Sequence, residues 1–205
     1  MGTVNLENHV VSSNMAPSGT EPNEKVVSVY QTLGDLLEEG DDAFIEEGPD
    51  VVQSAIEDPA FFDGVSTEHA TDSYTRAKVI GREGEHVIRY MEWPPEYALM
   101  PHEHHGRPCF EVLVEGNLFL ANMEATDVED GRYTLEVTDT DVCWPGDAGI
   151  VDPRDGSDIH SVYSPVRTRS LHCYPDDNYY GVGYVPADDA DGDLYEREKF
   201  QLRED

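Results

Sequence analysis

The stretch His102-Glu103-His104-His105-Gly106-Arg107-Pro108-Cys109-Phe110-Glu111-Val112-Leu113-Val114-Glu115-Gly116 places two possible metal ligands directly before an apolar, strand-like run. His102 and His104 are two residues apart, so in an extended segment both imidazoles leave the same face, as a shared cation requires. A turn over residues 106–108 and a strand that ends near Gly116 are expected to follow. The stretch therefore predicts strand, turn and strand, with one side of a metal site.

The composition of the chain fits a single folded domain with an acidic surface. The formal net charge is −31, with 44 carboxylates against 13 basic residues over 205 residues, and only Lys25, Lys78 and Lys199 are lysines. This charge excludes a protein that binds the phosphate backbone of nucleic acids. Eleven tyrosines and six phenylalanines argue against disorder. A lysine-poor acidic coat is typical of proteins from salt-loving organisms, so we expect a halophilic protein.

Two further features concern the location of the protein and its cysteines. No window approaches the run of about 20 apolar residues that a membrane helix needs, and residues 1–18 lack a basic start followed by an apolar segment. We therefore expect a cytoplasmic protein with no membrane partner. The cysteines Cys109, Cys143 and Cys173 include no Cys-x-x-Cys pair, which argues against a disulfide scaffold or a structural zinc site.

The chain divides into an arm, one domain and a tail. Residues 1–22 show no apolar period and are expected to form a flexible arm, and residues 186–205 form an acidic tail to which we assign no function. Residues 23–185 form the expected domain. Its first part, 23–63, is predicted to be a helical cap, and its second part, 64–185, a β-barrel.

Helical periodicity is confined to the cap. Apolar residues at spacings of three and four predict an amphipathic helix from Asn23 that Gly40 stops. A second helical piece is expected to follow, broken by Gly48-Pro49 and bounded by Asp58-Pro59.

Period-two alternation predicts the strands of the barrel. Besides the quoted stretch, they are expected at residues 73–80, 86–93, 117–123, 132–137, 159–163 and 170–174, with an acidic loop over 124–131. On the first of these strands Tyr74 and Arg76 share a face, and an inward Arg76 needs a carboxylate from the protein or a ligand. The alternative is that Arg76 points outward into the acidic surface.

The last strand carries a polar row. Ser170, His172 and Tyr174 share one face, with Leu171 and Cys173 on the other. Such a row can also be simply exposed to solvent.

The opening stretch contains His102-x-His104, then four residues, then Cys109, then six residues and Gly116. This spacing resembles the first motif of the cupin superfamily of small antiparallel β-barrels. Where most cupins carry a metal-binding glutamate this chain has Cys109, which resembles the cysteine dioxygenases, the thiol-oxidising branch with a three-histidine iron site. Tyr74-x-Arg76 and Ser170-x-His172-x-Tyr174 resemble further motifs of that family, and the likeness extends from about residue 30 to residue 184. It implies a mainly β, jelly-roll barrel with N-terminal helices packed on it.

The resemblance also implies three groups of site residues. The expected metal ligands are His102, His104 and His160, the last of which follows the turn at 144–147 that resembles the start of a second cupin motif. The expected substrate-binding residues are Tyr74 and Arg76. The expected catalytic residues are Tyr174, His172, Ser170 and Cys109. A thioether between Cys109 and Tyr174 is part of this expectation, and the alternative is that Cys109 is a small packing residue.

These expectations describe an iron-dependent enzyme similar to cysteine dioxygenase. It would hold Fe(II) and oxidise L-cysteine with O2 to cysteine sulfinate, incorporating both oxygen atoms. Its expected partners are the thiol and O2 alone, with no nucleic acid, and its expected state is a monomer. Two alternatives stay open, namely a dioxygenase of 3-mercaptopropionate or another small carboxylated thiol, and a non-enzymatic metal-binding cupin. His86 and His105 are not expected to bind the metal.

Overall fold

A computed structural model describes residues 12–13, 22–65, 72–81, 84–155, 158–176, 180–188, 193–201 and 203–204. The helices are α1 (Glu24–Glu39), α2 (Asp41–Ile56) and the short 3-10 helices η2 (Pro59–Phe62) and η3 (Pro153–Asp155). The main strands are β2 (Thr75–Gly81), β3 (Val87–Trp93), β4 (Tyr97–Glu103), β5 (Cys109–Glu115), β6 (Leu118–Glu129), β7 (Arg132–Cys143), β8 (Ala148–Val151), β9 (Ile159–Ser164), β10 (Thr168–Tyr174), β11 (Tyr180–Pro186) and β12 (Tyr195–Gln201). A short parallel pair joins β1 (Ser12–Ser13) to β13 (Arg203–Glu204).

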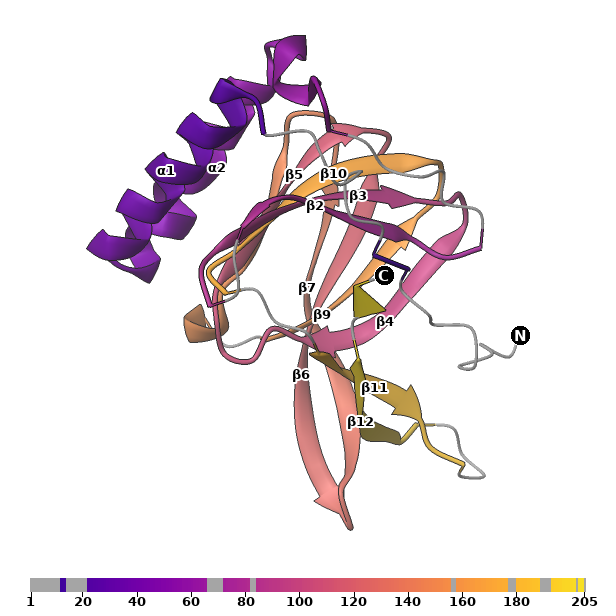
Figure 1. The fold of residues 1–205 in the computed structure, drawn as a ribbon. Coiled ribbons are helices and arrows are strands. Elements are labelled where there is room, and N and C mark those ends of the chain that lie inside the picture. The colour runs from indigo at the N-terminus through magenta and orange to yellow at the C-terminus, as the bar shows by residue number, and fades with distance from the viewer. Residues whose placement is uncertain are drawn as a thin grey trace.

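The main strands form two antiparallel groups around one interior (Figure 1). One group is a five-stranded sheet in the order β2-β3-β10-β5-β8, and the other has the order β11-β12-β7-β6-β9-β4 and closes because β11 also pairs with β4. Side chains from both groups, including Trp93, Leu113, Leu118 and Val162, form the apolar core between them. The predicted antiparallel barrel is confirmed.

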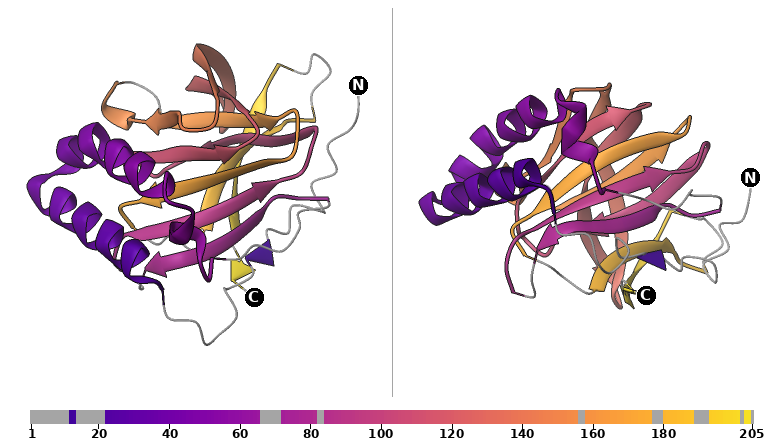
Figure 2. Two further views of the ribbon diagram at one scale, coloured as in Figure 1. Left: turned by 90° about the horizontal axis from the view of Figure 1, so that it is seen from above. Right: turned by 45° about the horizontal axis from the view of Figure 1, so that its top comes forward.

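The helices α1 and α2 pack side by side on the outer face of the five-stranded sheet (Figure 2). Val26, Leu33 and Phe44 of the helices join Phe110 and Leu171 of the sheet in a second core. The sheet is therefore buried on both faces, which explains why every residue of β3 is buried. The predicted packing of the N-terminal helices on the barrel is confirmed.

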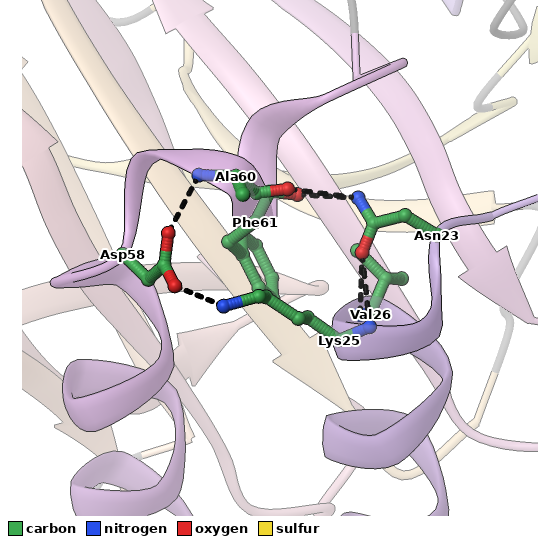
Figure 3. A network of polar contacts seen from close by, with 6 residues as sticks. All are labelled: Asn23, Lys25, Val26, Asp58, Ala60 and Phe61. Carbon is green, nitrogen blue, oxygen red and sulfur yellow. Dashed lines mark hydrogen bonds and ion pairs between the residues drawn. The ribbon is translucent and has the colours of Figure 1, made fainter.

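Asn23 fixes the start of α1 (Figure 3). Its Oδ1 accepts hydrogen bonds from the backbone N–H groups of Lys25 and Val26, each at 3.0 Å, as an N-cap residue does. Its Nδ2 donates to the carbonyl of Phe61 at 2.9 Å, and Lys25 forms an ion pair with Asp58. The predicted start at Asn23 and end at Gly40 are confirmed, and the contacts join α1 to η2.

The expected break at Gly48-Pro49 is wrong, because α2 runs through both residues. Pro49 lacks the N–H that would bond to the preceding turn, but it and Gly48 lie on the buried face of the helix. A Cβ at Gly48 would lie 2.7 Å from Cε1 of Phe110, so the glycine permits close packing of α2 on β5. This burial outweighs the local breaking tendency.

The expected loop over 124–131 is also wrong. Strands β6 and β7 extend through it, and the turn between them consists of Asp130 and Gly131 alone, with φ of 53° and 77°. Two consecutive positive φ angles suit a tight hairpin turn, which Asp-Gly favours. The exposed end of this hairpin buries few apolar side chains, so apolar alternation fades where the backbone pairing continues.

The two ends of the chain differ in how much of them the structure describes. The predicted flexible arm, residues 1–22, lies outside the described residues except for positions 12, 13 and 22. Within the tail that received no assignment, 195–201 form β12, which pairs with β11 and β7. In the described ranges, no helix combines the length and apolar character needed to cross a membrane.

Candidate metal centre

Three histidines gather at one end of the barrel interior. His102 on β4 is paired in register with His160 on β9, and His104 follows the last residue of β4. The ring centroids lie 5.0 Å apart for His102 and His104, 4.7 Å for His102 and His160, and 4.6 Å for His104 and His160. One ring nitrogen of each lies within 4.8 Å of the other two, so the three side chains could hold one metal ion.

The surroundings of the imidazoles select their metal-binding form. His102 Nδ1 lies 3.0 Å from the carbonyl oxygen of Met100, and His104 Nδ1 lies 3.4 Å from that of Asp158. Each Nδ1 therefore carries the hydrogen, and each Nε2 keeps its lone pair for a metal. Burial lowers the pKa of His102 to about 4 and the pKa values of His104 and His160 well below their ordinary value. All three are neutral at neutral pH, as metal binding requires.

The nearby carboxylates serve the scaffold. The two carboxylate oxygens of Asp158 accept hydrogen bonds from the backbone N–H groups of His104, at 3.1 Å, and Gly106, at 2.9 Å. Glu103 accepts a hydrogen bond from Tyr184 Oη at 2.6 Å and forms an ion pair with Arg197 of β12. The histidine donor set and its burial fit a divalent metal ion held by three neutral nitrogens, without a carboxylate from the protein.

The other two histidines considered above lie apart from this group. His86 stacks on Tyr30 with a centroid distance of 3.9 Å, and its Nε2 lies 2.8 Å from the Tyr30 carbonyl oxygen, so it joins β3 to α1. His105 occupies the turn after β4 with φ of 58°. Neither belongs to the three-histidine group.

The polar row on β10 faces the barrel interior. Ser170 and His172 are buried, while Leu171 and Cys173 belong to the core beneath the helices. The alternative that the row is exposed to solvent is therefore wrong. Trp93 Nε1 donates to Ser170 Oγ at 2.9 Å, Ser170 Oγ lies 2.8 Å from His172 Nε2, and His172 Nδ1 lies 3.4 Å from Tyr174 Oη.

The row has a preferred direction of hydrogen bonding. Because Ser170 Oγ already accepts from Trp93, its own hydrogen is available for His172 Nε2. The ring hydrogen of His172 then sits on Nδ1, opposite Tyr174 Oη. This arrangement leaves the Tyr174 hydroxyl hydrogen free to be donated into the cavity.

Arg76 and Tyr74 also face inward. Arg76 is 6% exposed, and its Cζ lies 5.5 Å from the centre of the Tyr174 ring. The alternative that Arg76 points into the acidic surface is wrong. Tyr74 stacks on Trp93 with a centroid distance of 4.8 Å and an interplanar angle of 14°. Both residues line the same cavity.

Cys109 begins β5 and is buried. The pairing of β10 with β5 sets Cys173 opposite Phe110, so one step further along this register Cys109 lies opposite Tyr174. Burial raises the pKa of the Cys109 thiol well above its ordinary value. The position permits a thioether to Tyr174, which stays a prediction.

These side chains share one cavity of about 80 Å³. Its lining includes the three grouped histidines, Arg76, Tyr74, Cys109, His172 and Tyr174, together with the apolar side chains of Met91, Leu99 and Val162. The cavity suits a small molecule with an anionic group, held between a guanidinium and the three histidines.

Three further residues shape this site and were not expected from the sequence: Trp93, Glu111 and Asp158. Glu111 had a detectable signal, since it is the single charged residue in the run Phe110-Glu111-Val112-Leu113-Val114, two positions after Cys109. That spacing puts it on the interior face. The contributions of Trp93 and Asp158 depend on contacts between strands distant in sequence, which spacing does not disclose.

No family model matches the chain, and no curated protein matches it by sequence. It is similar in fold to a cupin superfamily protein from Desulfitobacterium hafniense, with 12% identity, coverage of 56% of this chain and 86% of that one, and a TM-score of 0.36. An RmlC-like cupin protein from Desulfovibrio desulfuricans is similar with 14% identity, coverage of 54% of this chain and 90% of that one, and a TM-score of 0.40. The polyketide cyclase RemF from Streptomyces resistomycificus is similar with 18% identity, coverage of 61% of this chain and 80% of that one, and a TM-score of 0.39.

Such low similarity carries no argument about activity. The strand pairing of the chain itself defines a mainly β, cupin-like double-stranded β-helix with two N-terminal helices packed against it. This barrel contains a group of three histidines that could bind a metal ion.

Proposed function

We propose that this chain is a thiol dioxygenase that oxidises L-cysteine with O2 to cysteine sulfinate at a three-histidine Fe(II) site. The observation that carries the proposal is the position of Arg76, whose buried guanidinium lines the same small cavity as the three imidazoles. A guanidinium binds a carboxylate through two parallel hydrogen bonds. A molecule held in this way presents its far end to the histidines.

The histidines His102, His104 and His160 would hold the iron. With three neutral donors the positive charge of the ion is not reduced by a protein carboxylate, which favours a thiolate as a further ligand. When bound, Fe(II) would supply the Lewis acidity and the redox chemistry that O2 needs to react with a thiol. The overall reaction, R–SH + O2 to R–SO2H, balances without an external reductant.

The other residues would bind and orient the substrate. Arg76 and Tyr74 would hold the carboxylate, which fixes the distance from that group to the sulfur. Tyr174 would donate its hydroxyl hydrogen to the reacting sulfur or oxygen, because His172 already supplies a hydrogen bond to its oxygen. Met91, Leu99 and Val162 would exclude water from this end of the cavity.

Oxygen consumption by iron-loaded protein tests this function. With L-cysteine we expect one O2 consumed for each cysteine sulfinate formed, and His86→Ala, which is outside the site, should behave in the same way. Turnover of cysteine and 3-mercaptopropionate at equal concentrations decides between these two thiols. Iron-loaded protein that consumes no O2 with either thiol would reject the proposal and favour a non-enzymatic metal-binding cupin.

A further inference from the structure

Glu111 is a buried acid that the proposed mechanism does not use. It is 1% exposed, and it lies opposite His172 of β10 on one side and Gly149 of β8 on the other. Its Oε2 lies 3.7 Å from His172 Nδ1, and its Oε1 is buried without a hydrogen-bond partner among the described residues. An ionised carboxylate here would lose its hydration without compensation, so the neutral acid is favoured.

Gly149 leaves room for this carboxyl group. A Cβ at position 149 would lie 3.0 Å from Glu111 Oε1 and 2.5 Å from Cδ1 of Leu120. A larger residue at position 149 would require Leu120 to move and would press on the carboxyl group of Glu111. The cross-strand pair of Glu111 and Gly149 therefore fits the acid into the interior of the barrel.

The groups that face Glu111 do not offset a negative charge. The titrating groups that interact with it are His172 and Tyr174 on β10, Cys109 on β5 and Cys143 at the end of β7. The buried guanidinium of Arg89 on β3 is one strand further away, beyond His172. Burial lowers the pKa of His172 to about 3 and raises the pKa of Tyr174 and both cysteines, so all four are neutral at neutral pH. Burial likewise raises the pKa of Glu111 to about 8.

We infer that Glu111 is a positioning residue for the Ser170-His172-Tyr174 row: as a neutral acid it leaves the Nδ1–H of His172 to Tyr174, and as a carboxylate it takes that hydrogen bond. His172 Nδ1 lies between the two acceptors, 3.4 Å from Tyr174 Oη and 3.7 Å from Glu111 Oε2. A carboxylate is a stronger acceptor than a neutral phenol. Loss of the Glu111 proton to solvent therefore releases Tyr174 from its orienting donor. The catalytic meaning of this switch rests on the proposed function.

The switch itself can be tested on metal-free protein, without turnover. In ¹⁵N NMR spectra of the imidazoles, the His172 signals should shift in a one-proton transition with a midpoint near pH 8. Glu111→Gln keeps the shape of the side chain but does not ionise, so it should abolish this transition. Glu115→Gln alters the same strand at a largely exposed side chain and should leave it unchanged.

A His172 transition that survives in Glu111→Gln, or its absence from the unmodified protein, overturns the inference. Should Glu111→Gln fail to fold, ¹³C NMR of the glutamate carboxyl groups in the unmodified protein decides, because Glu111 must then show a midpoint near pH 8. In the iron-loaded enzyme, the ratio of the kcat of unmodified protein to that of Glu111→Gln should fall between about pH 7 and about pH 9. An intact NMR transition without any thiol oxidation would reject the proposed function alone.

Discussion

Replacing Glu111 with glutamine should change how the stability of the metal-free protein depends on pH. Burial raises the pKa of Glu111 from 4.5 to about 8 on folding. The folded protein therefore keeps this proton over a range of pH in which the unfolded chain has lost it. The resulting stabilisation is complete below pH 4.5 and is lost as the pH rises to about 8.

The size of the effect follows from the two pKa values. Their difference corresponds to about 5 kcal/mol in the free energy of unfolding, since one pKa unit is about 1.4 kcal/mol. The glutamine side chain of the Glu111→Gln variant does not titrate. The free energy of unfolding of the variant, relative to that of the unmodified protein, should therefore rise by about 1.4 kcal/mol for each pH unit between about pH 5 and about pH 8, and be constant above.

Urea unfolding at constant high salt, with a chelator present, measures this difference. Titration of His102, His104 and His160 is common to both proteins and cancels in the comparison. Glu115→Gln, which removes a largely exposed carboxyl group from the same strand, is the matched control. Parallel curves for Glu111→Gln and the unmodified protein would show that burial does not raise the pKa of Glu111.

Four other predictions concern the site and the surface. His160→Ala should lose iron, measured by metal analysis, because two imidazoles hold it poorly, whereas His86→Ala should keep it; full iron occupancy in the former removes His160 from the ligand set. Arg76→Ala should reduce kcat/KM for cysteine at least about 100-fold and that for cysteamine, which has no carboxylate, far less; equal losses would refute the anchor role. Active protein made with iron, cysteine and air should contain a fraction lighter by about two hydrogens, with the peptides of Cys109 and Tyr174 linked, and only separate peptides would return Cys109 to a packing role. Unfolding midpoints should rise toward molar salt, where the Debye length is about 3 Å, because repulsion within a chain of net charge −31 is then screened; flat midpoints would contradict the halophilic interpretation.

The sequence predicted those parts of the fold in which apolar periodicity and backbone pairing coincide. The helix after Asn23 and the strand that ends at Tyr174 are both of this kind. The break at Gly48-Pro49 was wrong because local propensity was outweighed by packing on Phe110. The ends of β6 and β7 were missed because their residues pair through the backbone with little apolar burial.

For the candidate site, spacing and resemblance selected nine residues, and all of them except Ser170 line one cavity. What spacing cannot supply is the pairing between distant strands. The contact of Glu111 with His172 depends on the register of β5 against β10, and the hold of Asp158 on the turn after His104 depends on a loop more than fifty residues away. Such contacts are properties of the folded chain.

The strand β10 separates two compartments by the thickness of one backbone. Leu171 and Cys173 belong to the core beneath the helices, while His172 and Tyr174 line the cavity and Ser170 contacts His172 in the barrel interior, so neighbouring residues on one strand face different sides of the sheet. A change in how α1 and α2 seat on the sheet must therefore move the polar row as well. Removing the helices would expose the apolar outer face of the sheet and would also loosen the wall of the cavity. The helices are therefore not a separable module, and substitutions within them can alter the geometry of the polar row.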